Sequence, residues 1–168
     1  RAAVNKGSFY HFFPSKTTLA IAALDDYWQS IEPDLEKILN AAVKPNEKLK
    51  NLALYIYEQQ KKKREETGHV CGCPYAALGS EMSMQDETLR KAVEVKLESI
   101  AVYLEQILSE AAAQNMISAD NIKEKAREMD MFIIGILTIA RVRNDLNLFQ
   151  HDLEQGLMRI SGINALSA

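Results

Sequence analysis

The feature that most constrains the fold is the recurrence of an apolar residue every three or four positions along most of the chain. The pattern is cleanest between residues 86 and 114, at Leu89, Val93, Leu97, Ile100, Leu104, Ile107, Leu108 and Ala111. This spacing places the side chains on one face of an α-helix. β-branched runs are scarce, and the 168 residues include only 7 Gly and 4 Pro. The chain is therefore predicted to be all-α.

The same spacing, together with flanking cap residues, predicts where the other helices lie. We expect them at residues 16–40, 49–66, 74–81, 119–143 and 146–161. Ser15 and Ser118 precede two of these helices, in the N-cap position that serine favours. Gly68 follows a third helix, where glycine commonly provides the stop. Pro33 lies inside the first helix and is expected to kink it, because proline lacks a backbone donor.

One stretch, residues 131–140, is apolar on every side of its predicted helix. Such a helix must be buried all round, yet it is too short to cross a membrane, which needs about 20 apolar residues. In a chain of this size we expect a second copy to cover part of it, and the sequence therefore predicts a homodimer. The residues assigned to the dimer interface are Ile133, Ile136, Leu137, Phe149, Leu153, Leu157 and Ile160.

Charge is unevenly distributed along the chain. The net charge is −3, but residues 1–16 contain Arg1, Lys6 and Lys16 and no acidic residue. A basic tip on an acidic body suits a protein that contacts phosphate at one end only. The two cysteines are too few for a disulfide framework, which favours a reducing, cytoplasmic location.

The basic tip contains a short helix candidate, Asn5–Phe13, which ends before Pro14. Phe9 and Phe13 would anchor this helix, and its polar side chains would face outward. Amines and hydroxyls donate to phosphates and base edges, and Gly7 would let the backbone approach DNA closely. The residues expected to contact DNA are Asn5, Lys6, Gly7, Ser8, Tyr10, His11 and Lys16.

The run Lys6–Lys16 resembles the recognition helix of the TetR family of bacterial transcriptional regulators, K-G-(S/T)-(F/L)-Y-x-(H/Y)-F-x-(S/N)-K. The resemblance implies a remnant of a helix-turn-helix domain at residues 1–24 and a ligand-binding and dimerisation domain at residues 25–168. In this family the last two helices pair with those of a second copy, which agrees with the homodimer. Ala3 stands where the family usually has glycine, and the two helices that should precede the turn are absent. We therefore expect this chain to bind operator DNA poorly or not at all.

A second notable stretch is His69–Leu78, which contains Cys73 directly before a proline. Proline favours the first helical position, so Cys73 is predicted to be an N-cap residue whose thiol pKa the helix dipole lowers. Three interpretations stay open: a small cap packed under a cavity, a reactive sensor thiol like that of some TetR-like regulators, or a metal site. The metal site would use His69, Cys71 and Cys73, and it lacks a fourth ligand nearby.

Aromatic side chains of the central helices are candidates for the walls of a small-molecule cavity. For each of them, packing in the core is the alternative role, and for Arg141 the alternative is a structural ion pair. The residues assigned to ligand binding are Trp28, Tyr55, Cys73, Tyr75, Tyr103, Phe132 and Arg141.

These features favour a dimeric transcriptional repressor that a small molecule or an electrophile releases from operator DNA. The ligand would move the helix that begins at Lys16 and change the spacing of the two recognition helices. A helical thiol- or metal-dependent enzyme and a ligand-free interaction module stay open as alternatives. The enzyme is disfavoured because His11, His69 and His151 are far apart and no HExxH, GxSxG or GxxxxGK[ST] motif occurs. We therefore assign no catalytic residue, metal or cofactor, and no membrane partner.

Overall fold

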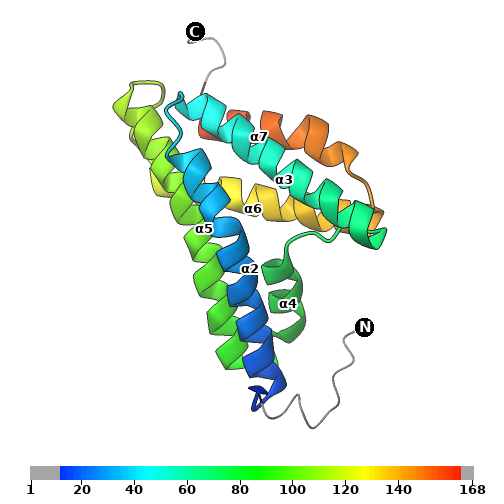
Figure 1. The fold of residues 1–168 in the computed structure, drawn as a ribbon. Helices are drawn as coiled ribbons and strands as arrows, with labels where there is room; N and C mark the ends of the chain where they lie inside the picture. Colours follow the sequence, from blue (N-terminus) through cyan, green and yellow to red (C-terminus); the bar gives the residue numbers. More distant parts are fainter. Residues whose placement is uncertain (1–11, 164–168) are drawn as a thin grey trace.

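A computed structural model describes residues 12–163, and every regular element in that part of the chain is a helix. The prediction of an all-α fold is confirmed. In chain order the elements are α2 (Lys16–Leu39), α3 (Pro45–Thr67), α4 (Pro74–Met82), α5 (Glu87–Ala113), α6 (Ile122–Arg143), the π-helix η1 (Phe149–Leu153) and α7 (Glu154–Ser161) (Figure 1).

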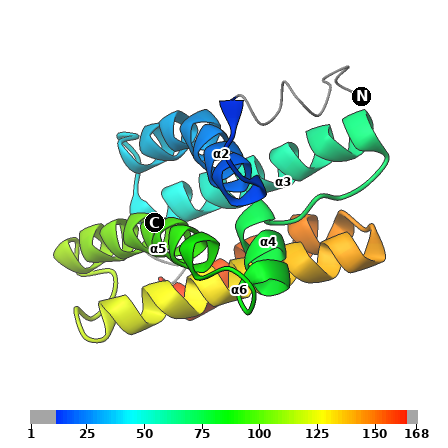
Figure 2. The same ribbon diagram turned by 90° about the horizontal axis from the view of Figure 1, so that it is seen from below.

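The helices form two groups that share one core. The long helices α2 and α5 lie side by side and begin at the same end of the molecule (Figure 1). Helices α3, α6 and α7 pack together near the other end of this pair. The short α4 packs against α5 and α6 (Figure 2). None of the described helices is long and apolar enough to cross a lipid bilayer.

Local chemistry sets most helix ends where the sequence predicts them. The Ser15 side chain accepts a hydrogen bond from the Thr18 amide at 3.0 Å and caps α2. Asp86 caps α5 by accepting from the Leu89 amide at 3.0 Å. Gly68 ends α3 in the left-handed conformation, with φ of 80°, which costs glycine no steric strain. These contacts satisfy amides and carbonyls that a helix end leaves unpaired.

Two boundaries differ from the prediction. Helix α6 begins at Ile122 after Asn121, whose φ is 58°, and not after Ser118. The Ser118 hydroxyl instead donates to the Asp120 carboxylate at 2.7 Å. Serine forms such local hydrogen bonds in turns as readily as at the start of a helix. The predicted last helix is divided into η1 and α7, and the wider turn of η1 still buries Phe149.

Helix α2 continues through Pro33 to Leu39 without a break. The proline ring is exposed. Proline removes the donor that would bond the carbonyl four residues earlier, which here belongs to the exposed Gln29. Water can satisfy that carbonyl, so the helix persists.

The core consists mainly of aliphatic side chains from α3, α5, α6, η1 and α7. Burying each of them contributes about 1.5–3 kcal/mol. The least exposed are Leu49, Leu89, Leu104, Leu108, Met129, Leu153 and Leu157. The buried Lys48 side chain carries a charge at the edge of this core. The Lys48 ammonium donates to the Leu39 carbonyl at 2.6 Å and to Glu110 at 2.5 Å, and so ties the end of α2 to α5.

Candidate functional site

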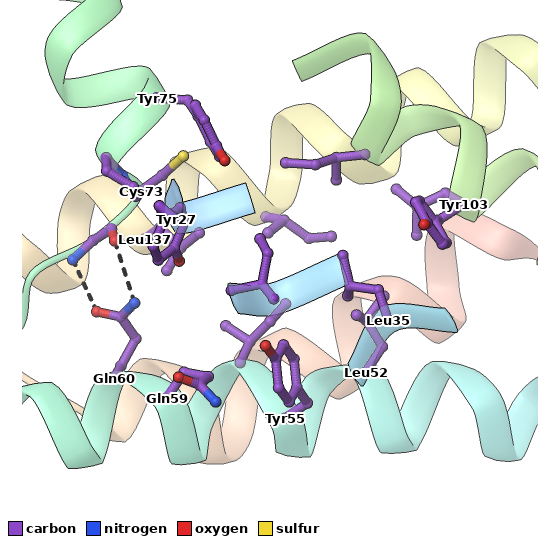
Figure 3. Close-up of a pocket in the computed structure, with 17 residues that line it drawn as sticks. Tyr27, Leu35, Leu52, Tyr55, Gln59, Gln60, Cys73, Tyr75, Tyr103 and Leu137 are labelled. Carbon is purple, nitrogen blue, oxygen red and sulfur yellow. Dashed lines mark hydrogen bonds between the residues drawn. The ribbon is translucent and has the colours of Figure 1, made fainter. Parts of the chain in front are cut away.

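A cavity lies between α2, α3, α5 and α6, and the start of α4 closes one side of it (Figure 3). Its volume is about 100 Å³. Helix α2 lines it with Tyr27, Ile31 and Leu35, which recur every four residues and therefore share one face. Helix α3 contributes Leu52, Tyr55, Ile56, Gln59 and Gln60 by the same spacing. The cavity is thus built from neighbouring stripes of helices that are distant in sequence.

A paired hydrogen bond closes the wall between α3 and the start of α4. The Gln60 amide nitrogen donates to the Gly72 carbonyl at 3.2 Å, and the Gly72 amide donates back to Gln60 at 2.8 Å (Figure 3). Gly72 has φ of 70°, and an added Cβ would lie 3.0 Å from the Leu137 carbonyl oxygen. Only glycine fits this backbone without strain. The polar atoms of the Gln60 side chain are therefore already satisfied inside the protein.

Tyr27, Tyr55, Tyr75 and Tyr103 bring phenol groups to walls that are otherwise mostly apolar. The Tyr75 hydroxyl donates to the Leu24 carbonyl at 3.2 Å, and the Tyr75 ring packs on Tyr27 with ring centres 5.6 Å apart. The Tyr55 hydroxyl is buried without a hydrogen-bond partner. Figure 3 shows Tyr55 extending from α3 with this hydroxyl directed toward the cavity. Burial raises the pKa of both Tyr27 and Tyr55 to about 12, so both remain protonated at neutral pH.

Cys73 is the N-cap of α4, as predicted, and its sulfur accepts from the Ala76 amide at 3.4 Å. The sulfur lines the cavity (Figure 3). The predicted fall in thiol pKa is wrong. Burial raises the pKa of Cys73, and the hydrogen bonds from the Ala76 and Tyr75 amides only partly oppose this. The desolvation of the thiolate destabilises it by more than the amides at the helix N-terminus stabilise it.

Four of the seven residues predicted to bind ligand line the cavity, namely Tyr55, Cys73, Tyr75 and Tyr103. The other three do not, because neighbouring positions on a helix face in different directions. Trp28 is buried between Tyr103, at 6.2 Å between ring centres, and the Lys96 ammonium, at 5.5 Å from its ring centre.

Phe132 and Arg141 also lie away from the cavity. The Phe132 ring packs against Gly156 of α7, close enough that an added Cβ would lie 2.0 Å from it. Arg141 is exposed and lines a shallow surface groove beside His69 and Cys71. Neither side chain is among those that line the cavity.

Tyr27, Gln59 and Gln60 also line the cavity and are not among the predicted ligand-binding residues, although a signal was present. Tyr27 belongs to the stripe that continues through Ile31 and Leu35, whereas Trp28 belongs to the adjacent stripe with Leu24. Two stripes on one helix have the same period, so periodicity alone does not say which of them faces a cavity.

The predicted dimer-interface residues are mostly buried within the single chain. Ile133 and Leu137 line the cavity, and Phe149, Leu153 and Leu157 belong to the core. Ile136 is also buried, and Ile160 is partly buried. Their burial therefore needs no second copy, because α3, α5 and α7 already cover these faces of α6 and its neighbours.

A different face of α6 remains exposed in the single chain. Met131 is 64% exposed, Ile139 46% and Val142 81%. Thr138 lies on the same face and is also exposed. These four residues, called here the α6 outer face, repeat at helical spacing. The all-round apolar pattern of residues 131–140 thus combines an inner face that the chain buries itself and an outer face that it does not.

The predicted DNA contacts lie almost entirely outside the described residues. This applies to Asn5, Lys6, Gly7, Ser8, Tyr10 and His11. Lys16 is the first residue of α2 and is exposed. Next to it, the Thr17 hydroxyl donates to the Asp86 carboxylate, which joins the start of α2 to the start of α5.

The side chains proposed for a metal site do not converge. Cys71 is exposed and donates to the His69 carbonyl at 3.7 Å, whereas Cys73 is buried against the cavity. Within residues 12–163, no three His, Cys, Asp or Glu side chains gather in a way that could hold a metal ion.

Comparison with known proteins adds independent information. A family model described as the tetracycline repressor-like C-terminal domain matches residues 45–155. The chain is 28% identical over 155 residues to an HTH-type transcriptional regulator in the lacX 3′ region of Lactococcus lactis, covering 90% of this chain and 74% of that protein. It is 27% identical over 107 residues to the HTH-type transcriptional repressor NemR of Escherichia coli K12, covering 64% of this chain and 52% of NemR.

The fold also matches solved structures. A TetR family transcriptional regulator from Agrobacterium tumefaciens superposes with a TM-score of 0.79 at 22% identity, covering 93% of this chain and 80% of that chain. At this identity the match concerns the arrangement of the helices.

Proposed function

This chain belongs to the TetR family of transcriptional regulators, and we propose that residues 25–168 form the ligand-binding and dimerisation domain of a repressor. Residues 1–24 would then be part of its DNA-binding domain. The cavity between α2 and the rest of the helical body is the observation that carries the proposal. The relatives named above are transcriptional regulators, which supports a regulatory role in the cytoplasm over an enzymatic one.

Helix α2 would carry the signal from the cavity to the DNA-binding segment. Tyr27 lines the cavity ten residues after Thr17, which is about 15 Å along a helix. A ligand that presses on Tyr27 or Ile31 would shift α2 against α5 and alter the link between Thr17 and Asp86 at the far end. The ligand must bind one position of α2 more tightly than the other for this coupling to exist.

Selection of DNA by the full-length protein tests the regulatory role. Duplexes would be selected from a random library and their binding measured by fluorescence polarisation. We expect enrichment of an inverted repeat, with half-sites about 10 base pairs or a multiple of that apart, because a dimer places two recognition helices on one side of the duplex. A library that shows no enriched sequence after selection would contradict the proposal.

The α6 outer face would form the dimer interface. It is largely apolar and is exposed in the single chain, and α6 is one of the last helices, which the resemblance to the family implies would pair with those of a second copy. We expect Ile139→Glu to convert a dimer into a monomer, because an interface must desolvate the new carboxylate. Val95→Glu is the matched control, since Val95 is an exposed valine on α5. Light scattering coupled to gel filtration measures the result, and a dimer that survives Ile139→Glu would place the interface elsewhere.

A further inference from the structure

The walls of the cavity between α2, α3, α5 and α6 carry no formal charge. Among the described residues that line it, every side chain is aliphatic, aromatic, amide or thiol, and none is Asp, Glu, Lys, Arg or His. Moving an ion from water into such a site is costly when no counter-charge meets it. The cavity is therefore suited to a neutral molecule.

The size of the cavity limits the ligand to about one ring. Its volume is about 100 Å³, which is less than that of an apolar protein cavity of about 150 Å³ that binds benzene, so even one substituted ring fits only if side chains of the wall move apart to admit it. Tyr27, Tyr55, Tyr75 and Tyr103 supply aromatic walls, against which a flat ring can pack edge to face or offset.

One fully buried polar atom among the cavity-lining residues is left without a hydrogen-bond partner. Three buried side-chain atoms of the described residues lack a hydrogen bond, on Asn46, Tyr55 and Asp130, and of these only Tyr55 lines the cavity. The nearby polar groups of Gln60 and Tyr75 are already bonded to backbone atoms. A buried hydroxyl without a partner is destabilising, and a ligand that accepts its hydrogen bond would remove that cost. A phenolic hydroxyl can both donate and accept a hydrogen bond, but it donates more strongly than it accepts, so the complementary ligand group that we assign is an acceptor.

From these observations we propose that the effector is a neutral, single-ring molecule with one hydrogen-bond acceptor, and that the Tyr55 hydroxyl donates to this acceptor. The inference rests on the proposed function, since it names the ligand class of the proposed effector cavity. It assigns Tyr55 as the residue that selects for the acceptor, and the apolar and aromatic walls as the surface that binds the ring.

A pair of probes with nearly the same shape isolates the hydrogen bond. Acetophenone has a carbonyl oxygen where α-methylstyrene has a methylene group. Isothermal titration should give about tenfold tighter binding of acetophenone, because one net hydrogen bond of about 1.4 kcal/mol corresponds to a factor of ten. In Tyr55→Phe this preference should disappear while both probes still bind. Since that variant only removes an unpaired hydroxyl, its thermal stability without a probe should equal or exceed that of the parent chain.

Tyr57→Phe is the matched control on the same helix. The Tyr57 hydroxyl accepts from the Gln150 side chain at 2.8 Å and does not line the cavity, so this variant should keep the tenfold preference. Equal binding of the two probes by the parent chain, loss of the preference in Tyr57→Phe, or tighter binding of benzoate than of acetophenone would each overturn the proposal. These titrations contain no DNA, so their failure is distinct from a failure to select an operator.

Discussion

Asp130 is a buried carboxylate that should lower the stability of the folded chain at neutral pH. It lies on α6, is 9% exposed, and has one oxygen without a hydrogen-bond partner. Burial raises its pKa from 3.8 to about 6. The charged groups that line the same groove are Arg90, Glu94, Glu98 and Arg127. Arg90 is engaged by Glu94 at 3.0 Å and by Glu87, and burial is the one cause of the raised Asp130 pKa.

The sign of the effect follows from proton binding. The folded state binds the Asp130 proton more tightly than the unfolded state does, so ionisation of Asp130 destabilises the folded state. Its cost is absent below about pH 4, grows as the pH rises from about 4 to about 6, and is constant above that. A pKa of about 6 in place of 3.8 corresponds to about 3 kcal/mol at pH 7.5.

Asp130→Asn tests this value because it removes the charge and keeps the shape. We expect the free energy of unfolding to rise by about 2 kcal/mol at pH 7.5, somewhat less than the full cost because the new amide donors also need partners. The advantage should shrink by about 2 kcal/mol at pH 4.5, where Asp130 is protonated in the folded state. Urea unfolding followed by circular dichroism, at fixed ionic strength and protein concentration, measures both values.

The control is Asp26→Asn, which changes an exposed aspartate on α2. It should alter the free energy of unfolding by less than about 0.5 kcal/mol. If Asp130→Asn is destabilising at pH 7.5, or if its effect is the same at both pH values, Asp130 is ionised and well bonded and the reasoning is refuted.

Two further predictions concern packing and thiol reactivity. Gly156→Ala would place a methyl group 2.0 Å from the Phe132 ring, so the free energy of unfolding measured in urea should fall by about 1–3 kcal/mol. Adding Phe132→Leu should restore part of this loss, whereas an unchanged stability of Gly156→Ala would show that the ring moves freely. Iodoacetamide at pH 7 should modify the exposed Cys71 at least about tenfold faster than Cys73, because burial raises the pKa of the Cys73 thiol and blocks access to it. Mass spectrometry of peptides measures both rates, and equal rates would favour a reactive sensor thiol at Cys73.

Much of the secondary structure follows from the sequence because its causes are local. The apolar spacing around Leu104 marks one face of α5 whatever packs against it, and Ser15, Gly68 and Cys73 each lie at a helix end that their own chemistry favours. The same local pattern yields the all-α class, and the run Lys6–Lys16 indicated the family that the match over residues 45–155 shows.

The roles of individual side chains depend on which helix packs against which face, and only the tertiary structure decides this. Tyr27 and Trp28 are adjacent in sequence, yet one lines the cavity and the other packs beside Tyr103. Likewise, Ile133 is buried by its own chain while Ile139 is exposed. Burial and solvation, which also raise the pKa of Asp130, are set by neighbours from distant segments, and helical periodicity contains no information about those neighbours.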